Sequence, residues 1–251
     1  MELLAVEGLP EIRAGDDLAG ILAERLSRAG GPGLCDGDIL VVTQKVMSKA
    51  ENRFIALADI EPSREARELA TLVRKDPALV ELVLRESVAV VRQSPHVLIT
   101  RHRLGHVMAN AGIDASNVGD GNEGKVLLLP ADPDASAAAI RARLDAALGM
   151  TIAVVVSDSF GRPWRMGTTD VAIGVAGMAA LVDQRGEPDR DGRAMEVTQV
   201  AVADAVAAAA GLVMGEGRES IPAVIVRGWL ASGPHQTSAA LLRPVDKDLF
   251  R

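Results

Sequence analysis

Acidic, hydroxyl and basic side chains follow directly after the clearest buried strand predicted from the sequence, Ile152–Val156. Asp158 and Ser159 come first, and a carboxylate at the end of a buried strand can hold a hard cation against phosphate oxygens. An isolated Asp-Ser pair more often caps a turn than binds a ligand. Arg162 and Arg165 follow closely and could pair with phosphate or carboxylate. Together with the next segment, Gly167–Asp170, these arginines favour a functional site.

Two lysines follow a second apolar run, Ile39–Val42. Lys45 and Lys49, together with Gln44 and the neighbouring hydroxyl groups, could bind phosphate oxygens at the end of a buried strand. The segment is not a P-loop, because the Gly-x-x-x-x-Gly-Lys spacing is absent. A solvated lysine pair is the alternative interpretation.

Two polar segments elsewhere could supply further ligands. In Asn110–Asn117, Asp114 is a candidate metal ligand and Asn117 a candidate nucleotide ligand, although Asx-rich surface turns are common. In Met214–Pro222 the glycines allow a ligand to approach the backbone, and Glu216 could complete a metal site. The alternative for this second segment is a plain turn between a helix and a strand.

Composition excludes several classes of function. The chain has 251 residues, a net charge of -7 and 2% aromatic residues, which argues against binding the phosphate backbone or stacked bases of nucleic acids. Cys35 is the only cysteine, so a cysteine-rich metal site and an intrachain disulfide are excluded. We find no secretory signal at the N-terminus and no apolar run long enough to span a membrane, and we expect a cytoplasmic protein.

Hydrophobic periodicity and cap residues predict the elements that must position these groups. The predicted helices are Leu18–Ala29, Ser63–Val73, Pro77–Arg85, Asp134–Leu148 (capped near Asp134 or Ser136) and Thr198–Ala210. The predicted strands are Ile39–Val42, Val88–Val91, His96–Thr100, Val126–Leu129, Ile152–Val156 and Ala223–Val226. Because helices and strands do not alternate regularly, we predict an α/β or α+β fold without a regular doubly wound sheet.

Taken in order, these segments resemble the coenzyme F420-0:L-glutamate ligase family along nearly the whole chain. The segments that carry the resemblance are Gly8–Leu18, Asp36–Asp38, Lys45, Ser48–Glu51, Asn110–Asn117, Asp132–Ser136, Ser157–Asp170 and Leu242–Phe250. The last segment is similar to the end of the ligase portion of a two-domain form of the family. We therefore expect one ligase unit over residues 1–251, of one domain or two intertwined subdomains, without the flavin-reductase-like second domain.

The resemblance implies an enzyme with a distinctive α/β fold that dimerises. Such an enzyme uses GTP and a divalent metal, Mg²⁺ or Mn²⁺, with stimulation by K⁺. It activates the terminal carboxylate of the deazaflavin precursor F420-0 as an acyl phosphate, forms an amide with L-glutamate and adds further glutamates through γ-linkages. No protein nucleophile is needed, which agrees with the absence of a Gly-x-Ser-x-Gly motif.

The resemblance also implies roles for particular residues. Asp114 and Asp158 would hold one metal, while Ser159 and Glu216 would help to hold a second. Asp158, Arg162 and Arg165 would act in catalysis. The residues that would bind the nucleotide are Gly8, Leu9, Pro10, Glu11, Gln44, Lys45, Lys49, Asn117, Met214, Gly215, Gly217, Arg218, Glu219, Ser220 and Ile221.

Departures from the family pattern leave two other hypotheses open. Thr168 stands where the family usually has Gln, Ser159 replaces Thr, Gln199 replaces Glu, and Glu216 stands where some members have Gln. The change at Thr168 motivates a sister ligase that adds glutamate to another precursor, such as a pterin or furan cofactor. The third hypothesis is a non-catalytic nucleotide-binding homologue with a decayed site.

Overall fold

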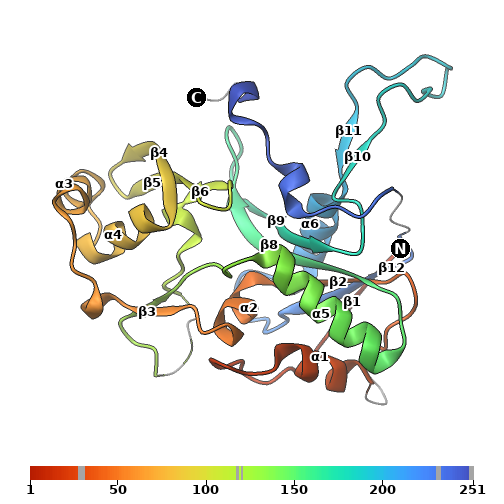
Figure 1. Cartoon of the computed structure of the whole chain (residues 1–251), viewed down its shortest axis with the longest axis horizontal. Helices are drawn as coiled ribbons and strands as arrows, with labels where there is room; N and C mark the ends of the chain where they lie inside the picture. The colour runs from red at the N-terminus through yellow and green to blue at the C-terminus, as the bar shows by residue number, and fades with distance from the viewer. Residues whose placement is uncertain (28–31, 117–118, 120, 230–232, 249–251) are drawn as a thin grey trace.

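A five-stranded sheet forms the centre of the molecule in the computed structural model, which describes residues 1–27, 32–116, 119, 121–229 and 233–248 (Figure 1). Its strands lie in the spatial order β1 (Glu2–Ala5), β12 (Ala223–Arg227), β2 (Ile39–Thr43), β8 (Ala153–Gly161) and β9 (Thr168–Ala176). β2 and β8 run parallel, whereas the other neighbours in this sheet run antiparallel. The mixed α/β fold without a regular doubly wound sheet is therefore confirmed.

Helices cover both faces of the central sheet. α1 (Leu18–Ser27) and α5 (Pro133–Leu148) pack on the face to which Leu40 points, and α6 (Val202–Met214) packs on the opposite face with Val41. Successive side chains of a strand point to opposite faces, so a strand covered on both sides must be apolar throughout. This burial explains the continuous apolar runs of β2 and β8.

A smaller lobe packs around its own hydrophobic cluster. It contains α3 (Arg64–Val73), α4 (Pro77–Arg85) and a three-stranded antiparallel sheet of β4 (Ser87–Ser94), β5 (Val97–His102) and β6 (Val107–Ala109). The lobe lies beside the end of the β8–β9 hairpin (Figure 1). It therefore borders the edge of the central sheet at which the predicted site residues gather.

Short elements connect the lobe and the central sheet. They are α2 (Gln44–Ala50) and the paired strands β3 (Phe54–Ala56) and β7 (Lys125–Leu127). The paired strands β10 (Leu181–Asp183) and β11 (Gln199–Ala201) lie in the chain between β9 and α6. The 3₁₀ turns are η1 (Leu57–Asp59), η2 (Asn110–Gly112), η3 (Ser238–Leu241) and η4 (Val245–Lys247). The chain between β10 and β11 extends away from the body of the molecule (Figure 1). No helix in the described ranges is long and apolar enough to cross a membrane.

Predictions based on caps and apolar periodicity are largely confirmed. Ser63 caps α3 by accepting a hydrogen bond from Ala66 N at 3.1 Å, and α4 begins at Pro77 as predicted. The helix predicted from Leu18 is confirmed to Ser27. Its predicted last two residues and most of the glycine-rich stop after them lie outside the described residues.

Several element boundaries differ from the prediction. The cap of α5 is Asp132, which accepts from Ala135 N at 2.9 Å, rather than Asp134 or Ser136. The strand predicted to end at Leu129 ends at Leu127, because its partner β3 is short. The helix predicted over Thr198–Ala210 begins at Val202, because Gln199–Ala201 pair with β10. β8 continues beyond Val156 to Gly161, because β9 pairs with its whole length.

Candidate functional site

Topology brings the separate polar segments of the sequence to one edge of the central sheet. Because β2 and β8 are parallel neighbours, Thr43 lies opposite Ser157 at their carboxyl ends. β12 runs antiparallel to β2, so the loop that precedes β12 arrives at the same edge, where Thr43 N donates to Pro222 O at 2.9 Å. The carboxyl end of a parallel pair is a common ligand site in sheets of this kind.

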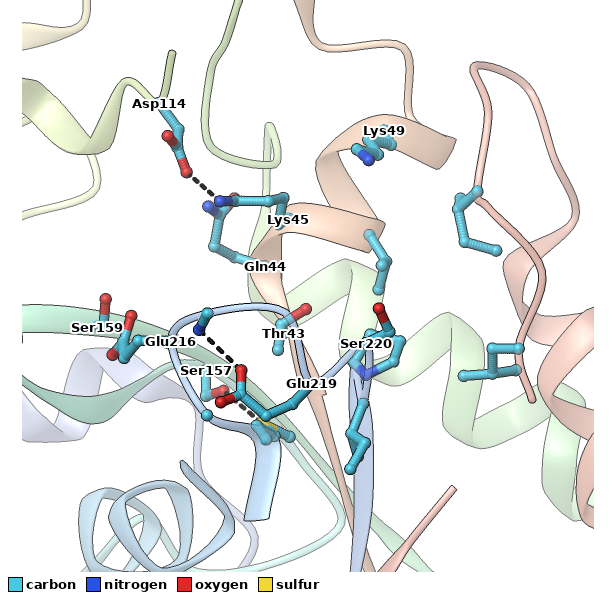
Figure 2. A pocket seen from close by; sticks show the side chains of 18 of the residues that line it. Thr43, Gln44, Lys45, Lys49, Asp114, Ser157, Ser159, Glu216, Glu219 and Ser220 are labelled. Carbon is cyan, nitrogen blue, oxygen red and sulfur yellow. Dashed lines mark hydrogen bonds and ion pairs between the residues drawn. The ribbon is translucent and has the colours of Figure 1, made fainter. Parts of the chain in front are cut away.

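The segments enclose a cavity of about 970 Å³ (Figure 2). Most of the predicted site residues line it: Leu9, Pro10, Glu11, Gln44, Lys45, Lys49, Asp114, Asp158, Ser159 and Met214–Ile221. Its volume is in the upper part of the range of small-molecule sites, which run from about 300 to 1,000 Å³. The four segments singled out by residue chemistry, around Lys45, Asp114, Asp158 and Glu216, therefore lie at one cavity, together with Leu9–Glu11, which the resemblance implied.

Two lysines of α2 reach into the cavity and are held there by carboxylates. Lys45 Nζ lies 2.6 Å from Asp114 Oδ2 and also donates to Ser116 O at 3.3 Å. Lys49 Nζ lies 2.6 Å from Glu11 Oε1. Figure 2 shows Lys45 directed at Asp114, with Lys49 further along the same helix. An anionic ligand would have to compete with these carboxylates for the two ammonium groups.

Three aspartates of the cavity are perturbed in different directions. Burial opposes ionisation of Asp114, but hydrogen bonds from Lys45 and Ser116 outweigh it and lower the pKa of Asp114. Burial, together with the carboxylates of Asp114 and Asp170, raises the pKa of Asp158 to about 8, although the charge of Lys45 opposes the shift. Burial and the nearby charge of Glu216 raise the pKa of Asp170 to about 6. The positive charge near the carboxyl groups of β8 and β9 is therefore too small to offset their burial and mutual repulsion.

The donor chemistry of these residues suits a divalent cation. Mg²⁺ and Mn²⁺ prefer carboxylate and hydroxyl oxygens, and a cation beside Asp158 and Asp170 would supply the missing positive charge. Among the described residues, however, no three acidic or histidine side chains already converge into a complete ligand set. Magnesium is commonly bound through one or two carboxylates together with waters and substrate phosphates, so a complete set of protein ligands is not required.

The loop before β12 is shaped by its glycines. Gly215 has a φ of 69°, and a Cβ on this residue would lie 2.3 Å from the carboxyl carbon of Glu219. Glu219 in turn accepts a hydrogen bond from Gly217 N at 2.8 Å, which folds the loop back over the cavity (Figure 2). Glycine is therefore required here both for conformation and for space.

Some predicted site residues lie elsewhere. Gly8 does not line the cavity and packs beside the Arg25 side chain. Arg162 and Arg165 lie in the turn between β8 and β9, outside the cavity lining, and Arg162 donates to Met166 O at 3.4 Å. Asn117 lies outside the described residues. These four assignments remain predictions.

Sequence reasoning missed Asp170 as a site residue. Asp170 lies opposite Ser159 in the β8–β9 register and lines the cavity. Gly211 of α6 makes room for it, since a Cβ there would lie only 1.9 Å from Asp170 Oδ2. The polar stretch around Asp170 was visible in the sequence, but its place depends on the pairing of β9 with β8.

Comparison with known proteins agrees with the geometry. The profile of the family described as F420-0:Gamma-glutamyl ligase matches residues 8–228, a range that contains every segment of the cavity. The chain belongs to the F420-0:gamma-glutamyl ligase family. The predicted resemblance to this ligase family is thereby confirmed.

Relatives within the F420-0:gamma-glutamyl ligase family match the chain from end to end. The chain is 46% identical to the coenzyme F420:L-glutamate ligase of Methanothermobacter thermautotrophicus, over 100% of this chain and 99% of that protein. It is 43% identical to the protein of the same name from Methanopyrus kandleri, over 99% and 98% of the two chains. With that from Natronomonas pharaonis it shares 46% identity over 100% and 95%.

Proposed function

We propose that this protein is a GTP-dependent amide ligase that joins L-glutamate to the carboxylate of F420-0. The observation that carries the proposal is the convergence of two lysines, a glycine-containing loop and six acidic residues on one cavity, in a chain of this ligase family. The names of the relatives, coenzyme F420:L-glutamate ligases, supply the two substrates to be joined. We further propose that the enzyme works as a homodimer and can add more than one glutamate.

The chemistry of amide formation explains why a nucleotide is needed. A carboxylate and an amine do not condense unaided in water, because the carboxylate is a poor electrophile. Transfer of the γ-phosphoryl group of GTP to a carboxylate oxygen gives an acyl phosphate and GDP. The amino group of glutamate then attacks the acyl carbon, the C–O bond to phosphate breaks, and inorganic phosphate leaves.

The residues of the chain serve this reaction by positioning and charge. Lys45 and Lys49 exchange their carboxylate partners for phosphate oxygens and stabilise the charge that moves during transfer. The backbone of the Met214–Ile221 loop closes one side of the nucleotide site. Asp114, Asp158, Ser159, Asp170 and Glu216 would hold Mg²⁺ or Mn²⁺, which would neutralise phosphate charge when bound.

Mass spectrometry of F420-0 incubated with the protein, GTP, L-glutamate and Mg²⁺ or Mn²⁺ tests the proposal. A product heavier by one or more glutamyl units is expected, and the mass gives the number of additions. Omission of glutamate is the control and should leave F420-0 unchanged. A folded protein that binds GTP but extends only a pterin or furan precursor would be a sister ligase, and one that extends no precursor would be a non-catalytic homologue.

A further inference from the structure

A second cavity, of about 640 Å³, lies between the smaller lobe and the β8–β9 hairpin. Strands β4 and β5 line one side, the hairpin lines the other, and the segment around η3 closes an end. None of its lining residues belongs to the lining of the nucleotide cavity. The proposed reaction has a third substrate besides GTP and L-glutamate, and this acceptor needs a site next to the one that binds the nucleotide phosphates.

The walls of the second cavity are suited to an aromatic ring. Phe160, Val171 and Ile99 contribute half-buried apolar side chains. The ring of His106 meets Phe160 edge to face, with ring centroids 5.9 Å apart and an angle of 86° between the planes. Such an edge-to-face pair forms a firm aromatic wall against which another ring can pack. Burial lowers the pKa of His106 to about 4, so this wall is uncharged at neutral pH.

Arginines lie around the rim of the same cavity. Arg92 and Arg243 are exposed and form no ion pair with any described residue. Arg101 lies 3.6 Å from Asp248. In a protein whose net charge is -7, a cavity with two uncompensated arginines is suited to an anionic ligand.

The second cavity neighbours the reaction centre along β8, since Asp158 lines one cavity and Phe160 the other. In the β8–β9 register Asp158 lies opposite Val171, so both side chains are on one face of the ribbon. Phe160 is two residues further along the same face, about 7 Å from Asp158 at the usual rise of a strand. A ligand held against Phe160 and Val171 can therefore extend its tail toward Asp158, which lines the nucleotide cavity.

We propose that the second cavity binds the acceptor substrate, with its planar deazaflavin ring against Phe160 and Val171 and its anionic tail guided by Arg92 and Arg243 toward Asp158. This inference rests on the proposed function and adds to it the location of the acceptor. The cavity volume is within the range of about 300–1,000 Å³ in which small-molecule ligands are bound.

The test is binding of F420-0, followed by its own fluorescence, to the wild-type protein and to the double variant Arg92→Gln/Arg243→Gln. We expect the dissociation constant of F420-0 and its KM in ligation to rise at least about tenfold in the double variant, since each lost charged contact removes about 1 kcal/mol or more. The dissociation constant of GTP should not change. Arg143→Gln, an exposed arginine on α5 outside both cavities, is the matched control and should behave as the wild type.

A second variant, Phe160→Leu, tests the aromatic wall and should weaken binding of F420-0 without affecting that of GTP. Unchanged affinity for F420-0 in both variants, with ligation intact in the wild type, would overturn the location but leave the proposed function standing. An equal loss of F420-0 and GTP binding would show that the variants act through the fold and would also overturn it. A wild-type protein that neither binds nor extends F420-0 would refute the proposed function, and the inference with it.

Discussion

At the scale of single residues, Asp158 occupies a position that disfavours its own charge. Burial and the carboxylates of Asp114 and Asp170 raise its pKa to about 8, whereas an unfolded Asp ionises near 3.8. Asp158→Asn keeps the shape and removes the charge. We expect the ligase activity of this variant to fall by about 1,000-fold or more, because the carboxylate that would bind the metal ion at the reaction centre is lost. Without metal or nucleotide it should be more stable than the wild type at pH 7, by about 1–3 kcal/mol.

Urea unfolding in the presence of a chelator, together with steady-state ligation, measures both effects of Asp158→Asn. Asp191→Asn, an exposed aspartate in the chain between β10 and β11, is the control and should change neither quantity. Full activity in Asp158→Asn would remove this residue from the site. A loss of stability would show that its carboxylate is compensated in the folded protein.

We expect the ammonium group of Lys45 to exchange its ion pair with Asp114 for an ion pair with the phosphates of the nucleotide. Lys45→Met keeps most of the length of the side chain but cannot pair with phosphate. We expect GTP binding to weaken by about 10- to 100-fold, as lost charge-assisted hydrogen bonds are worth about 1.5–3 kcal/mol. Calorimetric titration with GTP measures the change. Lys75→Met, in the connection between α3 and α4, should bind GTP normally, and equal affinity in the two variants would contradict the assignment.

Residue types and spacing were sufficient to predict much of the cavity lining. Lys45, Asp114, Asp158 and Glu216 follow predicted strands or lie in polar turns, and chemistry alone marks them. Asp170 could not be found in that way, because its role depends on α6 leaving room for it and on its pairing with β8.

At the scale of elements, Asp134 ties α5 to the central sheet and to the C-terminal segment. It was predicted as a possible helix cap, but Oδ1 accepts from Val175 N at 2.7 Å and from Ser238 N at 2.8 Å. Oδ2 accepts from Ser238 Oγ at 2.9 Å. Because Asp134→Ala would leave the donors of two buried residues, Val175 on β9 and Ser238 on η3, without a partner, we expect a loss of about 2–4 kcal/mol in the free energy of unfolding.

Urea unfolding at pH 7 measures the loss in Asp134→Ala. Asp134→Asn is the matched variant, since its amide oxygen can still accept from Val175 N and Ser238 N, and it should lose less than half as much. Equal losses in the two variants would show that charge, and not hydrogen bonding of these donors, is what Asp134 contributes.

Several of the elements that the sequence did not reveal depend on distant pairing for their form. α3 and α4 were predictable because caps and periodicity are local signals. β9 and the extension of β8 carry polar residues where they border the cavity, so neither alternation nor an apolar run marks them. Gln199–Ala201 were assigned to a helix, and only pairing with β10 makes them a strand.

At the scale of the whole molecule, buried groups pull stability in opposite directions as the pH changes. The folded state binds a proton at Asp158 near pH 8 and at Asp170 near pH 6, well above the ordinary value of 3.8. Acidification from pH 8 therefore stabilises the folded state through these two groups. The pKa of His106 is lowered by burial from 6.5 to about 4, so the unfolded state binds that proton first and acidification destabilises the folded state.

Replacement of one group at a time should separate these opposing effects. The quantity to compare is the change in the free energy of unfolding when the pH falls from 8 to 5, in chelator and without nucleotide. For His106→Leu this change should be about 2 kcal/mol more favourable than for the wild type, because the unfolded variant no longer takes up a proton at His106. For Asp158→Asn the same change should be about 1–3 kcal/mol less favourable than for the wild type, since the folded variant no longer takes up a proton at this position. Urea unfolding at pH 8, 6.5 and 5 gives the pH profile of each protein, and the control His235→Gln, at an exposed histidine, should follow the wild type.

Parallel profiles for all four proteins would mean that neither buried group changes its protonation between the folded and unfolded states. Divergence in the stated directions would show that Asp158 in the reaction centre and His106 in the wall of the second cavity change the stability with opposite sign as the pH falls.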